Sequence, residues 1–388
     1  MPVNLRDLDL PGMTAALGGY GVDAGKAARV FAAVQRDGVA RVDGLDWISA
    51  PIRRALAVDA VFPDLEIVER RRAADGFVKY LLRLPDAGLI EAVRIPLPDP
   101  DDARDLKRRR RRGEAAGLVA LPTAKYTLCI SSQLGCALGC DFCATGRLRP
   151  AGGVRNLAVW EMLAQVRAMR VEADHPVCGV LFLGMGEPLL NYDNVIRTAQ
   201  ILSHPAGPAI AGESISISTV GVAPAIRRFA AERHRFRLII SLAAATGEAR
   251  LPLMPAEKPW PLAEVMAAVR EYAAVCRSRV TFAYVGISGV NMGREDARRL
   301  VELLAGLRAK VTLIDVNDDS GRYHPPNDDE VRGFRDELLA HHIPVSRRYA
   351  GGREIGAACG TLAATMAGGA VFLPGSDVGG AMSANEHL

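Results

Sequence analysis

Three cysteines lie close together in the run Cys136-Ala-Leu-Gly-Cys140-Asp-Phe-Cys143. Thiolates hold the irons of iron–sulfur clusters, and three of them leave one corner of a 4Fe-4S cube open to a small molecule. S-adenosylmethionine (SAM) can chelate that iron through its amino and carboxylate groups, and reduction of the cluster then yields a 5'-deoxyadenosyl radical. A structural zinc site is the alternative, but zinc favours a fourth Cys or His, and none lies between Cys143 and His175. We therefore predict a 4Fe-4S cluster on the three cysteines, with SAM as a second cofactor.

A second group of residues is predicted to bind SAM. The turn Gly184-Met-Gly186-Glu187-Pro188 follows a strand-like run, so its glycines allow the backbone to approach a ligand while Glu187 accepts a hydrogen bond from the SAM ammonium. Ser218, Ser241 and Asn317 also follow apolar strands. Each could simply cap the next helix, but together they suit contacts to ribose and methionine.

The four remaining cysteines divide into two pairs. Cys178 and Cys276 are expected to be small buried hydrophobes. Cys129 lies on the strand before the cluster loop, and Cys359 stands among small residues in Gly356-Ala-Ala-Cys359-Gly, from where it could reach the same site.

An alternation of short apolar runs with longer amphipathic runs begins at Tyr126, which predicts repeated βα units on a parallel sheet. Six such units in succession form a partial barrel, with the cluster loop after the first strand. The strands are expected at Tyr126 to Ser131, Val177 to Gly184, Ser214 to Thr219, Phe236 to Leu242, Val280 to Gly286 and Val311 to Val316. Their helices are expected to begin near Trp160, Asp193, Pro224, Leu262, Arg294 and Glu330.

The rest of the chain divides around this α/β barrel. Residues 1–98 are predicted to form a small α+β domain, with helical patterns up to Leu56 and strands near Val78 to Leu84 and Ile90 to Ile95. Residues 99–122 are a basic insertion in which Lys107 to Arg112 are all cationic; it is either a solvated loop or a surface for nucleic-acid phosphates. The barrel takes up residues 123–350, and residues 351–388 form a C-terminal segment that carries Cys359.

Composition predicts a globular protein of the cytoplasm. The chain has 388 residues, of which 49% are hydrophobic and 24% charged. No apolar run approaches the roughly 18 residues of a membrane span, and the first residues lack a signal-peptide pattern. Seven cysteines are too few for a secreted disulfide scaffold of this length. We expect a monomer without membrane contact.

At these motifs the sequence resembles the radical-SAM adenine methyltransferases of 23S ribosomal RNA, the RlmN/Cfr family. The matching segments are Leu128-Cys-Ile-Ser-Ser-Gln-Leu-Gly-Cys136-Ala-Leu-Gly-Cys140-Asp-Phe-Cys143, Gly184-Met-Gly-Glu-Pro-Leu-Leu-Asn191, Ala357-Ala-Cys359-Gly, Asp75-Gly76 with Lys79, and Ile90-Glu91-Ala-Val-Arg-Ile-Pro96. The resemblance implies a radical-SAM partial (β/α)6 barrel with a small N-terminal domain. It implies that Cys359 carries a methyl group, Cys129 resolves the covalent intermediate, and Glu91 accepts a proton. It implies SAM contacts at Gly186, Glu187, Ser218, Ser241, Ala243 and Asn317, with Ala243 standing where the family usually has His.

The resemblance also implies a reaction. An sp2 carbon of adenine is too electron-poor to attack the methyl group of SAM, so the methyl group first passes to Cys359, is activated by the radical, and joins the base. Attack by Cys129 on Cys359 then releases the product and leaves a disulfide. Carbon 2 of an adenine in 23S ribosomal RNA is the preferred target, with transfer RNA as a second substrate and flavodoxin or ferredoxin as electron donor. Adenine carbon 8, a small-molecule substrate, and a non-enzymatic iron–sulfur sensor or RNA-binding protein are the alternatives.

Overall fold

The computed structural model describes residues 2–99, 123–148, 150, 152–276, 279–318, 320–348 and 351–363. Lys107 to Arg112 of the predicted basic insertion, and the C-terminal segment after residue 363, lie outside these ranges. In the ranges that are described, no helix is both long and apolar enough to cross a bilayer.

One sheet of ten strands organises the molecule, in the order β14-β13-β12-β11-β10-β9-β6-β5-β4-β3. The six predicted barrel strands are present and parallel to one another. They are β6 (Thr123–Ile130), β9 (Val177–Phe182), β10 (Ile215–Thr219), β11 (Arg237–Leu242), β12 (Val280–Gly286) and β13 (Ala309–Asp315). A short strand that was not predicted, β14 (Val345–Arg347), pairs in parallel with β13.

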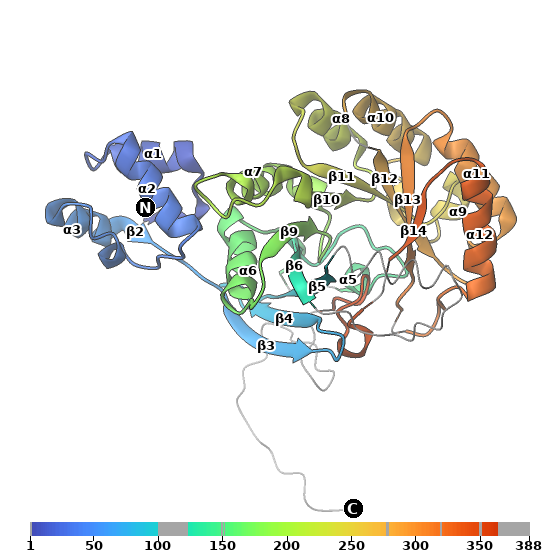
Figure 1. Ribbon diagram of the computed structural model, residues 1–388, viewed down its shortest axis with the longest axis horizontal. Coiled ribbons are helices and arrows are strands. Elements are labelled where there is room, and N and C mark those ends of the chain that lie inside the picture. The colour runs from blue at the N-terminus through green and yellow to red at the C-terminus, as the bar shows by residue number, and fades with distance from the viewer. Residues whose placement is uncertain are drawn as a thin grey trace, which may run out of the picture.

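Helices cover the outer face of the curved sheet, as Figure 1 shows for α8, α10, α11 and α12. Their apolar positions recur three and four residues apart, as predicted, and in α10 Val265, Ala268, Val269 and Tyr272 are all buried. The long barrel helices are α6 (Val159–Val171), α7 (Tyr192–Ser203), α8 (Ala223–Glu232), α10 (Leu262–Val275), α11 (Arg294–Leu304) and α12 (Asp328–Ala340). Two short helices, α5 (Ala144–Arg147) and α9 (Gly247–Arg250), lie in the loops after β7 (Gln133–Leu134) and β11. The short β7 pairs with β8 (Arg155–Asn156).

Three antiparallel strands continue the same sheet beyond β6. They are β3 (Glu66–Arg72), β4 (Val78–Arg83) and β5 (Leu89–Pro98). In the pairing of β5 with β6, Val93 is the partner of Cys129. The predicted domain borders stay a prediction, but the hydrogen-bonded sheet runs without a break from the N-terminal strands into the barrel.

The N-terminal helices pack beside α6 and α7 (Figure 1). They are α1 (Leu10–Gly18), α2 (Ala24–Gln35) and α3 (Ala50–Asp59), with a small parallel pair of β1 (Val3–Asn4) and β2 (Ala60–Val61). The Asp7 carboxylate accepts a hydrogen bond from the backbone of Trp160, at 3.0 Å, near the start of α6. Asp64 forms ion pairs with both Arg6 and Arg167. These contacts fix the helices to the barrel.

Candidate functional site

A cavity lies at the carboxyl ends of the barrel strands, where the sequence predicts the site. Its wall includes Cys129, Cys136, Cys140, Cys143, Gly186, Glu187, Ser218, Ser241, Asn317 and Cys359. Two of the predicted residues, Glu91 and Ala243, are fully buried and are not part of this wall. Ala243 packs with Leu253 and Met254 in a small apolar cluster, and Met254 of this cluster also lines the cavity. The fold therefore gathers residues that are up to 230 positions apart in sequence, from Cys129 to Cys359.

The three clustered cysteines form part of this wall, together with Leu138 and Phe142. Burial raises the pKa of Cys136 to about 11, and that of Cys140 well above the usual range of a thiol. Within the described ranges, no three Cys, His, Asp or Glu side chains could hold a single metal ion. The three thiols are compatible with a 4Fe-4S cube, in which each thiolate binds a different iron and the sulfurs need not converge on one point. The positive charge of the irons would also favour the thiolate forms that burial disfavours.

Glu187 presents a buried carboxylate to the cavity. It is 2% exposed. Its Oε1 accepts a hydrogen bond from the Leu189 backbone at 2.9 Å, and its Oε2 accepts one from Val220 at 3.0 Å. Burial nevertheless raises the pKa of Glu187 to about 7. A carboxylate held in this way would gain from a cationic partner, and an ammonium group of a ligand fits that role.

The other polar residues of the rim also form hydrogen bonds: two serines contact each other, and Asn317 contacts the backbone. Ser218 at the end of β10 and Ser241 on β11 have their hydroxyl oxygens 3.0 Å apart. Asn317, just after β13, donates from Nδ2 to the carbonyl of Asp315 at 2.9 Å and to the carbonyl of Cys359 at 3.3 Å. Asn317 therefore links the barrel rim to the segment that carries Cys359.

Cys359 lies in a segment that crosses the loop of the three cysteines. The carbonyl of Gly360 accepts a hydrogen bond from Ala144 at 2.8 Å, and that of Leu362 accepts one from the Thr145 hydroxyl at 2.6 Å. Both contacts fall on α5, directly after the cysteine loop. Cys359 is thus held at the cavity from the side of the predicted cluster.

Cys129 and Cys359 line the same cavity, and neither forms a disulfide in the described structure. Burial, together with the neighbouring Cys359, raises the pKa of Cys129 to about 12, whereas the guanidinium of Arg348 opposes the shift. Arg348 also belongs to the cavity wall. It was not predicted, because it follows the short β14 that the sequence pattern did not show.

Glu91 lies behind the wall, in an ion pair with Lys79 at 3.0 Å. Its Oε2 accepts a hydrogen bond from the backbone of Ala363 at 3.1 Å. The structure therefore places the predicted proton acceptor against the Cys359 segment, four residues after the cysteine.

The turn between β3 and β4 holds the same segment at its start. The Asp75 carboxylate accepts a hydrogen bond from Gly352 at 2.9 Å, and that of Glu354 accepts one from Ala74 at 2.7 Å. Gly351 fits against the ring of Phe77, which also lines the cavity. From the sequence, Asp75 was noted only as part of a family motif. Phe77 could not be recognised, because its role depends on a contact with Gly351, which is distant in sequence.

Known proteins with the same features identify the class and the family. A model described as the Radical SAM superfamily matches residues 130–304. A crystal structure of a radical SAM methyltransferase from Sphaerobacter thermophilus superposes with a TM-score of 0.80 at 33% identity, covering 94% of this chain and 100% of that one. The partial barrel with its three-cysteine loop is therefore that of a radical SAM enzyme.

Relatives that match over most of their length show which family within this class the chain belongs to. A "Probable RNA methyltransferase" from Myxococcus xanthus is 50% identical over 95% of this chain and 97% of its own length. A "Dual-specificity RNA methyltransferase RlmN" from Syntrophotalea carbinolica is 37% identical over 93% of this chain and 89% of its own length. The chain belongs to the RlmN-type family of radical SAM RNA methyltransferases, which confirms the predicted family and barrel fold. Membership of this family implies SAM and a 4Fe-4S cluster as cofactors.

Proposed function

We propose that this enzyme methylates carbon 2 of an adenine in 23S ribosomal RNA and of an adenine in transfer RNA, using Cys359 as methyl carrier. The observation that carries the proposal is that Cys129 and Cys359 share one cavity with the three cysteines of the cluster loop. The named relatives of the dual-specificity type support an RNA substrate. The run Gly186 to Asn191, which resembles the carbon 2 subgroup, supports the choice of carbon.

The cofactors would sit where the wall offers matching groups. Cys136, Cys140 and Cys143 would hold the cluster, and Glu187 would accept a hydrogen bond from the amino group of SAM. When bound, the cluster and SAM supply the 5'-deoxyadenosyl radical and the methyl group.

Two thiols of the chain carry the group transfer. Cys359 takes the methyl group on its sulfur and presents it to the adenine. Once one hydrogen atom has been removed from that methyl group, its carbon can bond to the adenine carbon, which then gives up its proton and one electron that the bound cluster could take. The Cys129 sulfur then attacks the Cys359 sulfur and the sulfur–carbon bond breaks. The carbon takes up a proton to become the methyl group of the released base, and a disulfide remains. Because its pKa is raised to about 12, the Cys129 thiol must lose its proton during this attack, and the cationic Arg348 favours the thiolate.

Glu91 is the proposed acceptor of the proton that leaves the adenine. Its carboxylate already accepts a hydrogen bond from Ala363 and pairs with Lys79. Reaching the base therefore requires the Cys359 segment to shift. An electron donor such as flavodoxin or ferredoxin would reduce the cluster, and we place the enzyme, as a monomer, in the cytoplasm.

Nucleoside mass spectrometry tests the proposal. Anaerobically reconstituted enzyme, SAM, reductant and unmethylated ribosomal or transfer RNA should yield 2-methyladenosine. 8-Methyladenosine would overturn the choice of carbon, and 5'-deoxyadenosine without any RNA product would favour a small-molecule substrate. Cys129→Ala should accumulate a covalent adduct between Cys359 and RNA, whereas Cys178→Ala, which changes a cysteine outside the cavity wall, should release product as the wild type does.

A further inference from the structure

The side chain of Gln133 lies directly behind the Gly186–Glu187 turn. Its Oε1 accepts a hydrogen bond from the backbone of Glu187 at 2.8 Å, and its Nε2 donates to Oδ1 of Asn156 at 2.7 Å. Gln133 is 4% exposed. We infer that Gln133, supported by Asn156, is a positioning residue that sets where the Glu187 carboxylate meets the amino group of SAM. The inference rests on the proposed function, in which Glu187 accepts that hydrogen bond.

The two side-chain amides have one consistent orientation. Because Oε1 of Gln133 faces a backbone donor, its Nε2 must face an acceptor, which is Oδ1 of Asn156. The Nδ2 of Asn156 then donates to the carbonyl of Leu190 at 3.0 Å. The two side chains therefore hydrogen-bond the turn at both ends, at the N–H of Glu187 and at the carbonyl of Leu190.

Gly186 brings the turn into contact with Gln133. Its φ is +97°, and a Cβ placed on it would lie 2.5 Å from Cβ of Gln133. Only glycine allows this conformation and this approach together. The carboxylate of Glu187 is thus located by a backbone that rests on the Gln133 side chain.

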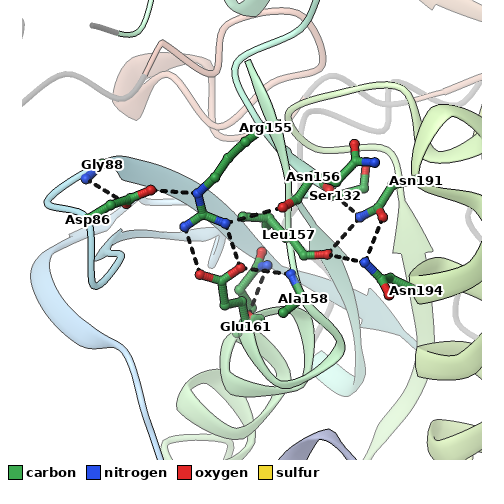
Figure 2. Close-up of polar contacts among 11 residues, drawn as sticks. Asp86, Gly88, Ser132, Arg155, Asn156, Leu157, Ala158, Glu161, Asn191 and Asn194 are labelled. Atoms are coloured by element: carbon green, nitrogen blue, oxygen red, sulfur yellow. Dashed lines mark hydrogen bonds and ion pairs between the residues drawn. The ribbon is translucent and has the colours of Figure 1, made fainter. Parts of the chain in front are cut away.

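The residues around Asn156 are anchored by contacts that do not involve the Gln133 side chain (Figure 2). Arg155, the neighbour of Asn156, is held between Asp86 at 2.5 Å and Glu161 at 2.8 Å. Asn191 donates to the carbonyls of Ser132 and Leu157, each at 2.8 Å. Removing the Gln133 amide would leave all of these contacts in place, so its loss should affect the position of Glu187 more than the fold.

Equilibrium binding to the cluster-loaded protein separates positioning from folding. The probes are SAM and its deaminated analogue, which has hydrogen in place of the amino group. Gln133→Met should weaken the binding of SAM about tenfold, because the buried N–H of Glu187 loses its acceptor and Glu187 moves. The affinity for the analogue should stay unchanged. Asn156→Ala should act in the same direction with a smaller loss, about threefold, because Gln133 remains. In RNA methylation, the KM for SAM should rise while kcat stays within about twofold of the wild type.

Gln35→Met is the matched control. Gln35 is also 4% exposed, and its amide donates to the carbonyl of Leu8 at 3.1 Å, among the N-terminal helices. This variant should lower the urea midpoint without changing either affinity.

The outcomes distinguish the inference from the proposed function. The positioning role would be overturned if Gln133→Met weakened the binding of SAM and of its analogue equally, or weakened the binding of neither. If wild-type enzyme bound both ligands equally well, the role of Glu187 in the proposed function would fail first.

Discussion

Alanine at position 351 should loosen the Cys359 segment from the turn between β3 and β4. A Cβ on Gly351 would lie 2.2 Å from Cε2 of Phe77 and 2.5 and 2.8 Å from two further ring atoms. The ring is 8% exposed, so it has little room to move. Overpacking of this kind costs about 1–3 kcal/mol. A middle value of about 2 kcal/mol raises the population of the detached segment about 30-fold, since 1.4 kcal/mol is a factor of ten.

Alkylation of Cys359 measures that population. In reduced, cluster-free protein, modification of Cys359 by iodoacetamide, followed by peptide mass spectrometry, should be about 30-fold faster in Gly351→Ala than in the wild type if local opening limits access. Gly333→Ala is the control, because a Cβ on that glycine of α12 would meet nothing within 4 Å. A wild-type rate in Gly351→Ala, or an equal increase in Gly333→Ala, would refute the reasoning.

Three further predictions concern stability and reactivity. Arg250→Met should lower the free energy of unfolding in urea by about 3–5 kcal/mol, because it leaves the Glu257 carboxylate without its fully buried ion-pair partner. As a control, Arg41→Met removes an exposed ion pair and should change the free energy of unfolding by less than about 0.5 kcal/mol. Burial opposes the shift, but hydrogen bonds from neighbouring side chains lower the pKa of Glu232 to about 2. Its folded pKa lies below the unfolded value of 4.5, so the stability that ionised Glu232 contributes is present above pH 4.5 and is lost as the pH falls toward 2. Over that pH range the free energy of unfolding of the wild type should fall by about 1 kcal/mol more than that of Glu232→Gln, a figure reduced because the side chain is partly exposed. Parallel plots of unfolding free energy against pH for the two proteins would contradict this. Because burial raises the pKa of Cys129 to about 12, the rate of its alkylation should rise about tenfold per pH unit from pH 7 to 9, and a plateau there would show a lower pKa.

The barrel could be predicted from the sequence because each of its strands is buried and each helix has one apolar face. Within the ten-stranded sheet, the two strands that were not predicted, β3 and β14, lack such patterns. In β3, the run Glu66–Arg72 contains mostly charged side chains, which suits the outermost strand of a sheet but not a search for apolar runs. The three residues of β14 are too few to show alternation.

The rim of the site could also be predicted, because parallel strands bring their carboxyl ends to one edge whatever the loops between them do. The way in which the Cys359 segment is attached to the N-terminal strands could not be predicted. Its hydrogen bond from Gly352 to Asp75 joins residues 277 positions apart, and the fit of Gly351 against Phe77 depends on ring placement. The predicted role of Glu91 as proton acceptor remains a proposal; in the structure its carboxylate pairs with Lys79.

The N-terminal strands control both thiols of the proposed reaction. Val93 on β5 is the sheet partner of Cys129, so β5 covers the edge of the strand that carries this cysteine. The turn before β4 holds the start of the Cys359 segment, and Glu91 on β5 holds its end at Ala363. Transfer requires the two sulfurs first to stay apart, while Cys359 presents its methyl group, and then to come within bonding distance. Since Cys129 is fixed in the sheet, the proposed movement falls to the Cys359 segment, which is held by the turn between β3 and β4, by Glu91, by α5 and by Asn317.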